Sequence, residues 1–211
     1  MTVKGLIAVL LSGSATASEF RFLDTEGSPL SGVAVSMTQY GPSQQTPAPS
    51  PLEIHQSERR FTPYISVIQR GTEVTFVNDD DISHHIYSAL GPKKFSFRLK
   101  AGEKNRLHGF DHSGAISLGC NVHDWMSGHL LVVDTPYFGF TDNKGKTDFR
   151  DLPAGKYQLS VWHPQLEITG NSWKQDIQVP LKTPVTFHIP AEMSAVPEQR
   201  SLDDFDFLDN Y

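Results

Sequence analysis

Short apolar segments separated by turn residues recur along the chain, and this alternation restricts the possible folds more than any other feature. In the segment 72–77, Val74 and Phe76 occupy alternate positions, so both side chains would point to the same face of a strand. No stretch of about 11 or more residues carries a convincing helical period. We therefore predict an all-β protein with strands at 19–24, 33–38, 64–69, 73–78, 85–88, 94–99, 115–119, 129–134, 156–163, 173–179 and 184–189.

The first 17 residues have the features of a secretory signal peptide. Lys4 supplies a positive charge, residues 5–11 form a short apolar run, and Ala15-Thr16-Ala17 is a small-residue cleavage pattern. The apolar run is much shorter than the roughly 20 residues that span a bilayer. We predict cleavage after Ala17, no membrane span, and export of residues 18–211 to a bacterial periplasm.

The rest of the chain is expected to form two β modules and a tail. The first module covers residues 18–135, and the second covers 136–190, beginning at a short hinge. The second module has only about 55 residues, a size at which an isolated core is marginal, so we expect it to pack on the first. The acidic tail 191–211 is expected to be disordered.

The charge distribution argues against one class of function. The net charge is −6, and the tail holds six acidic residues against Arg200, so the body of the protein is nearly neutral. Binding to nucleic acid requires a basic face, and this charge distribution gives no support for one. We expect a monomer that binds no nucleic acid.

Cys120, the only cysteine of the chain, lies among residues with metal-binding side chains. A free thiol in an oxidising compartment is prone to oxidation, whereas metal ligation would occupy it. His123 and Met126 follow Cys120 at three-residue intervals, and the pair His84-His85 offers a further imidazole. A thiolate, two imidazoles and a thioether form a donor set that selects copper and tolerates both Cu(I) and Cu(II). Zinc is the alternative metal, although a closed zinc site generally uses four strong nitrogen or sulfur ligands.

These residues also carry a family resemblance. The Cys120, His123 and Met126 spacing is similar to the short ligand loop of the amicyanin type, and residues 78–88 resemble the strand and loop that bear the first histidine of a cupredoxin. The resemblance covers about residues 18–135 and implies a Greek-key β-sandwich with one type 1-like copper. It implies the ligands His84, Cys120, His123 and Met126, with His85 as the alternative to His84.

The longer string 119–126, together with Trp162-His163-Pro164, resembles bacterial plastocyanin-like proteins of the methylamine-utilisation type. The second module resembles the carboxypeptidase regulatory-like or transthyretin-like β-sandwich, also described as Ig-like. Modules of that kind are usually non-catalytic, so the resemblance implies no reaction for it.

Other side chains near the ligands suggest separate roles. Asn121, Asp124 and Trp125 are candidates for tuning the copper, because its potential depends on hydrogen bonds to the thiolate and on local hydrophobicity. His129 follows Met126 by three residues and could reach the site, and His163 could cover it from the second module.

Two functions fit this sequence. The first is a periplasmic electron carrier that passes single electrons between redox partners, which the sequence does not identify. The alternative is a copper-binding module for buffering, delivery or sensing. We expect no enzymatic activity, because four protein ligands leave no open coordination position and no nucleophile with its base is evident.

Overall fold

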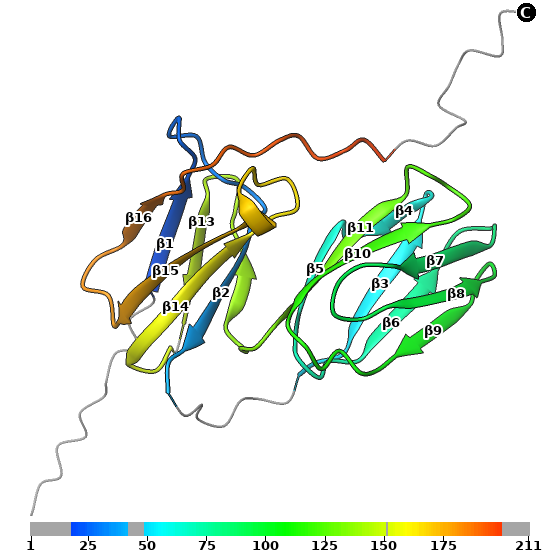
Figure 1. Ribbon diagram of the computed structural model, residues 1–211, viewed down its shortest axis with the longest axis horizontal. Coiled ribbons are helices and arrows are strands. Elements are labelled where there is room, and N and C mark those ends of the chain that lie inside the picture. The colour runs from blue at the N-terminus through cyan, green and yellow to red at the C-terminus, as the bar shows by residue number, and fades with distance from the viewer. Residues whose placement is uncertain (1–17, 42–48, 151, 200–211) are drawn as a thin grey trace, which may run out of the picture.

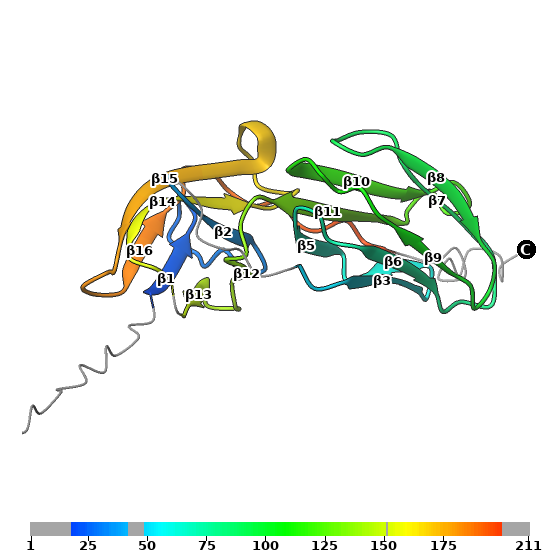
Figure 2. The same cartoon turned by 90° about the horizontal axis from the view of Figure 1, so that it is seen from below.

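The computed structural model describes residues 18–41, 49–150 and 152–199, and in these ranges it is built almost entirely from β-strands (Figure 1). The strands form four sheets, arranged as two β-sandwiches that lie end to end (Figures 1 and 2). The predicted all-β fold class is confirmed. The predicted signal peptide lies outside the described residues. Within those residues, no helix has the length and apolar character needed to cross a membrane.

The first sandwich, here called the site sandwich, contains β3 to β11. One sheet has the order β4 (Arg60–Thr62), β3 (Leu52–Ser57), β6 (Val74–Asn78), β9 (Lys104–Leu107). The other has the order β5 (Ile65–Gln69), β11 (Ser127–Val133), β10 (Gly114–Cys120), β7 (His84–Ser88), β8 (Phe95–Leu99). The pairs β3·β6 and β5·β11 are parallel, and all other pairs in this sandwich are antiparallel.

Alternating residues of both sheets fill the core of the site sandwich. Val74 and Phe76 are fully buried, as their spacing predicts, and they meet Ile86 and Leu130 from the facing sheet. Cys120 belongs to the same buried cluster. The core therefore extends to the end of the sandwich where the predicted ligands lie.

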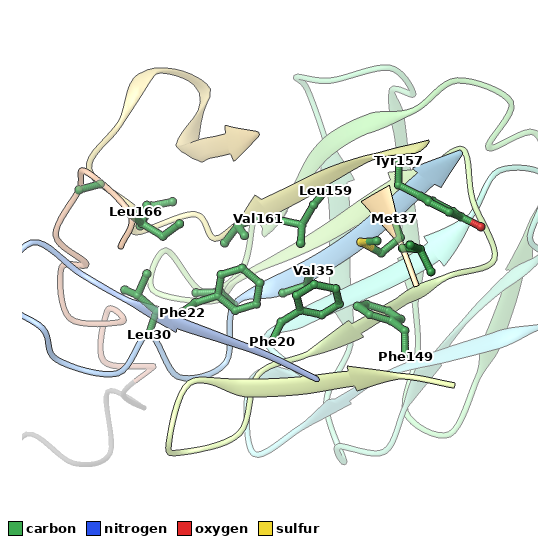
Figure 3. Close-up of a cluster of buried hydrophobic side chains, with 14 residues drawn as sticks. Phe20, Phe22, Leu30, Val35, Met37, Phe149, Tyr157, Leu159, Val161 and Leu166 are labelled. Carbon is green, nitrogen blue, oxygen red and sulfur yellow. The ribbon is translucent and has the colours of Figure 1, made fainter. Parts of the chain in front are cut away.

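The second sandwich, here called the flanking sandwich, is made from strands at both ends of the described chain. One sheet has the order β13 (Lys146–Phe149), β1 (Ser18–Leu23), β16 (Val185–His188). The other has the order β12 (Phe138–Phe140), β2 (Ala34–Gln39), β14 (Gly155–Trp162), β15 (Ser172–Val179), and a short 3-10 helix, Thr169–Asn171, precedes β15. Figure 3 shows the buried side chains between these sheets, among them Phe20, Phe22 and Tyr157.

This arrangement differs from the predicted division at residue 135. We expected residues 18–135 to form one module, but β1 pairs with β13 and β16, and β2 pairs with β12 and β14. The aromatic side chains of β1 explain the difference, because Phe20 and Phe22 are fully buried against Phe187 and Phe149 of the later strands. The site sandwich is thus an insertion between β2 and β12 of the flanking sandwich.

A small apolar cluster joins the two sandwiches. Ile65 and Val67 from the site sandwich pack with Ala34 and Trp162 from the flanking sandwich. The indole of Trp162 also meets the ring of His129 edge-on, with 6.1 Å between centroids. Beside this cluster, both sandwiches line an open cleft of about 440 Å³. The flanking sandwich therefore packs on the site sandwich.

The segment 191–199 connects the two sandwiches a second time, crossing from β16 to the site sandwich (orange to red in Figure 1). Met193 forms a β-bridge with Leu166. At the far end, Gln199 accepts a hydrogen bond from the backbone N–H of Ser127 at 3.0 Å and donates to its hydroxyl at 2.9 Å. The expectation of disorder is therefore wrong for 191–199, and residues 200–211 lie outside the described residues.

Acid should weaken the flanking sandwich through His163, which is 3% exposed. Burial, and next the charge of His129, lower the pKa of His163 to about 4. The unfolded chain has an ordinary histidine pKa of about 6.5, so it binds more protons than the folded protein between these values. This contribution to stability is complete above pH 6.5 and is lost as the pH falls toward 4.

His163→Asn should consequently remove about 2 kcal/mol of the difference in unfolding free energy between pH 7 and pH 5, as measured by urea unfolding. The side-chain oxygen of asparagine can still accept the hydrogen bond that Nδ1 of His163 takes from the Gln165 N–H. The exposed His112, changed to Asn, serves as the control. An unchanged pH dependence in His163→Asn would contradict this assignment.

Candidate metal centre

Pairing between β7 and β10 places the first two predicted ligands beside each other. Cys120, the last residue of β10, is opposite Ile86. His84, the first residue of β7, is two positions before Ile86, so its side chain lies on the same face of the sheet and diagonal to Cys120. A backbone hydrogen bond of 3.0 Å from Asn121 N–H to the His85 carbonyl continues this pairing into the loop.

The loop between β10 and β11 brings the third predicted ligand to the same point. Gly119 and Ser127 form the last residue pair of the β10–β11 hairpin, and the loop between them turns back through a 3.0 Å hydrogen bond from Met126 N–H to the His123 carbonyl. An i to i+3 bond of this kind closes a β-turn. His123 thereby faces Cys120 across the turn.

Three donor atoms converge as a result. The Cys120 Sγ lies 3.7 Å from His84 Nδ1 and 3.8 Å from His123 Nδ1. All three donors lie within 4.8 Å of one another, and the three side chains are buried. The imidazoles of His84 and His123 are 5.1 Å apart between centroids.

His85 takes no part in this cluster. Adjacent residues of a strand point to opposite faces, and the ring of His85 meets Ser96 Oγ at 2.8 Å and the Asn121 side-chain nitrogen at 3.3 Å. Of the two alternatives in the sequence, the structure brings His84 to Cys120 and uses His85 to link β7 with β8 and the loop.

Met126 is 1% exposed and belongs to the same buried cluster as Cys120. Its neighbour Trp125 packs its ring against His123, at 5.2 Å between centroids. The thioether is thus enclosed in the apolar core at the end of the sandwich, beside the loop that carries His123.

Gly119 explains why β10 can come this close to β7. A Cβ at this position would lie 2.8 Å from the ring of Tyr87, which is closer than real Cβ contacts allow. The missing side chain lets Tyr87 cover the strand immediately before Cys120. The site therefore has a tight apolar support on the face opposite the ligands.

Asn78 holds the loop that precedes His84. It is fully buried, donates a 2.7 Å hydrogen bond to the Ile82 carbonyl and accepts one of 3.0 Å from the Asp80 N–H. This loop places Asp80 beside His84, with 2.8 Å between Asp80 Oδ2 and His84 Nε2. Sequence analysis did not identify Asp80, and the only signal was a carboxylate four positions before the histidine.

Hydrogen bonding within the site governs its protonation. Burial lowers the pKa of His84, but its hydrogen bonds to Cys120 and Asp80 outweigh burial and leave this pKa raised. Burial raises the pKa of Cys120, but the hydrogen bond with His84 and several backbone N–H groups outweigh it and leave this pKa lowered. Burial, followed by the charges of His84 and Arg59, lowers the pKa of His123. The hydrogen-bonded pair of His84 and Cys120 therefore favours the thiolate, the form of cysteine that binds metals.

The donor separations fit a single metal ion. Metal bonds of about 2.3 Å to sulfur and about 2.0–2.1 Å to nitrogen, as found for zinc, would separate the two donors by about 3.8 Å at an angle of 120°. The measured separations from Cys120 to the two histidines, 3.7 and 3.8 Å, agree with this value. In the described residues the cluster contains three histidine or cysteine donors, one fewer than a closed structural zinc site.

Two other histidines, His129 and His163, were also candidates to reach or cover the site. His129 turns toward the junction of the sandwiches, where its ring meets Tyr64 at 5.2 Å and Trp162 at 6.1 Å. His163 is buried next to Trp162, and its Nδ1 accepts the N–H of Gln165. Neither belongs to the donor cluster of His84, Cys120 and His123.

Solved structures similar to this chain include copper proteins. A copper-containing nitrite reductase from Thermus scotoductus is 25% identical, with a TM-score of 0.38, over 46% of this chain and 25% of that one. A purple cupredoxin from Nitrosopumilus maritimus is 26% identical, with a TM-score of 0.35, over 38% and 98%. The Cu(I) form of an amicyanin mutant is 18% identical, with a TM-score of 0.37, over 46% and 99%.

This chain thus spans about a quarter of the length of the nitrite reductase. No protein-family model matches the sequence, and no curated protein does either. All three TM-scores are below 0.5, so these similarities do not assign a function to this chain.

The two adjacent histidines provide a direct test of the cluster. His84→Ala should weaken Cu(II) binding more than about 100-fold, because it removes a donor rather than a group behind a donor. His85→Ala should retain the three donors and change the affinity less than about tenfold. Competition with a chromophoric chelator measures both affinities. Equal losses in the two variants would contradict the assignment of His84.

Proposed function

We propose that this protein is a mononuclear, type 1-like copper protein that carries single electrons between redox partners in the periplasm. The observation that carries the proposal is the buried Cys120 sulfur with the Nδ1 atoms of His84 and His123 at 3.7 and 3.8 Å from it. Bound copper would supply reversible one-electron chemistry between Cu(I) and Cu(II). The periplasmic location follows from the signal-peptide pattern of residues 1–17.

The chain contributes a donor set suited to both oxidation states. Cys120 would provide the strong thiolate ligand, His84 and His123 the imidazoles, and Met126 a weak axial thioether. His84 and Cys120 belong to strands paired in one sheet, and Met126 is held in the core. Because paired strands and the core fix these side chains, little rearrangement should accompany a change of oxidation state.

An exposed apolar residue next to the ligands gives a partner a place to approach. Val122 lies between Cys120 and His123 in the chain and is 52% exposed. A redox protein that contacts Val122 would stand over the ligand loop. We propose this end of the site sandwich as the point where electrons enter and leave, with no reaction catalysed on a substrate.

The test is a visible absorption and EPR spectrum of the mature protein with one equivalent of Cu(II). We expect an intense thiolate-to-copper band that disappears in Cys120→Ala and cycles through ascorbate reduction and reoxidation. A weak signal independent of Cys120 would contradict the site. A Cys120-dependent site that fails to cycle but releases copper to a chelator would instead favour the delivery function.

Electron exchange between two copies of the protein tests the proposed approach face. Val122→Lys should slow Cu(I)/Cu(II) self-exchange at least about tenfold at low ionic strength, because it introduces repulsion between two like faces. Leu90→Lys is the matched control, since Leu90 is 72% exposed but follows the end of β7 opposite His84. Self-exchange is measured by NMR line broadening in mixtures of the two states. Equal slowing by both variants would exclude the Val122 face as the specific contact.

A further inference from the structure

Asp80 is a carboxylate enclosed behind the site. Its side chain is 12% exposed, and Oδ2 lies 2.8 Å from Nε2 of the fully buried His84. The other ring nitrogen of His84, Nδ1, is the atom that faces the sulfur of Cys120. The imidazole therefore lies between the carboxylate on one side and the donor cluster on the other.

The β3–β4 hairpin fixes the carboxylate itself. Glu58 N–H donates to Asp80 Oδ1 at 2.7 Å, and Arg59 N–H donates to Oδ2 at 3.0 Å. Both turn residues have positive φ angles, 54° and 56°, in a two-residue turn where asparagine and glycine are the preferred residues. Two non-glycine residues in this region cost energy, and the bonds to Asp80 compensate for that cost.

We propose that Asp80 is a positioning residue of the copper site, an inference that rests on the proposed function. By accepting the Nε2–H of His84, the carboxylate keeps Nδ1 free of a proton and directed at the metal. It also increases the electron donation of the imidazole, as a carboxylate behind a metal-bound histidine does. His123 has a different support, because its ring packs on Trp125.

This support should favour the more highly charged oxidation state. The negative carboxylate lies on the far side of His84, so it stabilises Cu(II) more than Cu(I). Asp80 would therefore increase copper affinity and lower the reduction potential of the site. If Asp80 only stabilised the hairpin, its substitution would change the affinities for Cu(I) and Cu(II) by the same factor.

Asp80→Asn and its neighbour Asp79→Asn form a matched pair. Both variants remove one negative charge from the same loop, but Asp79 contacts His55 at 2.6 Å rather than His84. Asp80→Asn should lower Cu(II) affinity about 10–100-fold and Cu(I) affinity less. A tenfold difference between the two losses corresponds to a potential raised by about 59 mV. Asp79→Asn should produce at most a small part of either effect.

Variants in a changed hairpin background separate the effect of Asp80 on His84 from its effect on the β3–β4 hairpin. Glu58→Asn with Arg59→Gly supplies a turn sequence that forms without Asp80, so Asp80→Asn can be compared within a hairpin that folds. In the wild-type Cu(I) protein, which is diamagnetic, NMR should detect the Nε2 proton of His84, protected from exchange and shifted downfield. This last measurement requires no substitution.

The inference is overturned if Asp80→Asn and Asp79→Asn have equal affinities and potentials in that background, or if the Cu(I) protein shows no exchange-protected Nε2 proton on His84. These outcomes can occur while the wild type keeps its Cys120-dependent copper band, in which case the proposed function stands. Absence of that band in the wild type would remove both proposals.

Discussion

The pairing of β7 with β10 is the interaction on which the site depends. Its register puts Cys120 opposite Ile86 and diagonal to His84, and the β10–β11 hairpin then returns His123 to the same point. A slip of one residue would turn every side chain of the strand to the other face and bring His85 toward the cluster in place of His84. The buried Ile86 opposes such a slip, because it would have to leave the core.

The position of β2 explains how the site sandwich is inserted into the flanking sandwich. Since β12 pairs with β2 at Phe138 opposite Ser36, the chain leaves and re-enters the flanking sandwich at adjacent strands. An insertion with its ends close together disturbs the host fold little. The segment 191–199 then returns to the site sandwich and binds Ser127, which directly follows Met126. The flanking sandwich is therefore connected to the ligand loop through an ordered contact.

Sequence analysis could predict what local patterns encode. Cys120, His123 and Met126 are close in the chain, and the strands containing Val74, Phe76 and Leu159 show plain alternation. The pairing partners of a strand are not encoded locally, because the sequence of β1 is compatible with either sandwich. The predicted domain boundary at residue 135 was wrong for this reason. β9 was not predicted because Lys104–Leu107 is a polar edge strand with little apolar alternation. Asp80 could not be assigned because its partners Glu58 and Arg59 come from a distant turn.

The two imidazoles of the site are held by unlike means, and this asymmetry has a chemical consequence. His84 is fully buried in a strand and hydrogen-bonded to a carboxylate, whereas His123 lies in a loop against an indole, next to the exposed Val122. A histidine fixed by a carboxylate is suited to set the electronic properties of a metal. A histidine in the loop beside exposed apolar surface is suited to transmit an electron to a partner. Under the proposed function, the fold would divide tuning and exchange between these two histidines, one supplied by the sheet and the other by the loop.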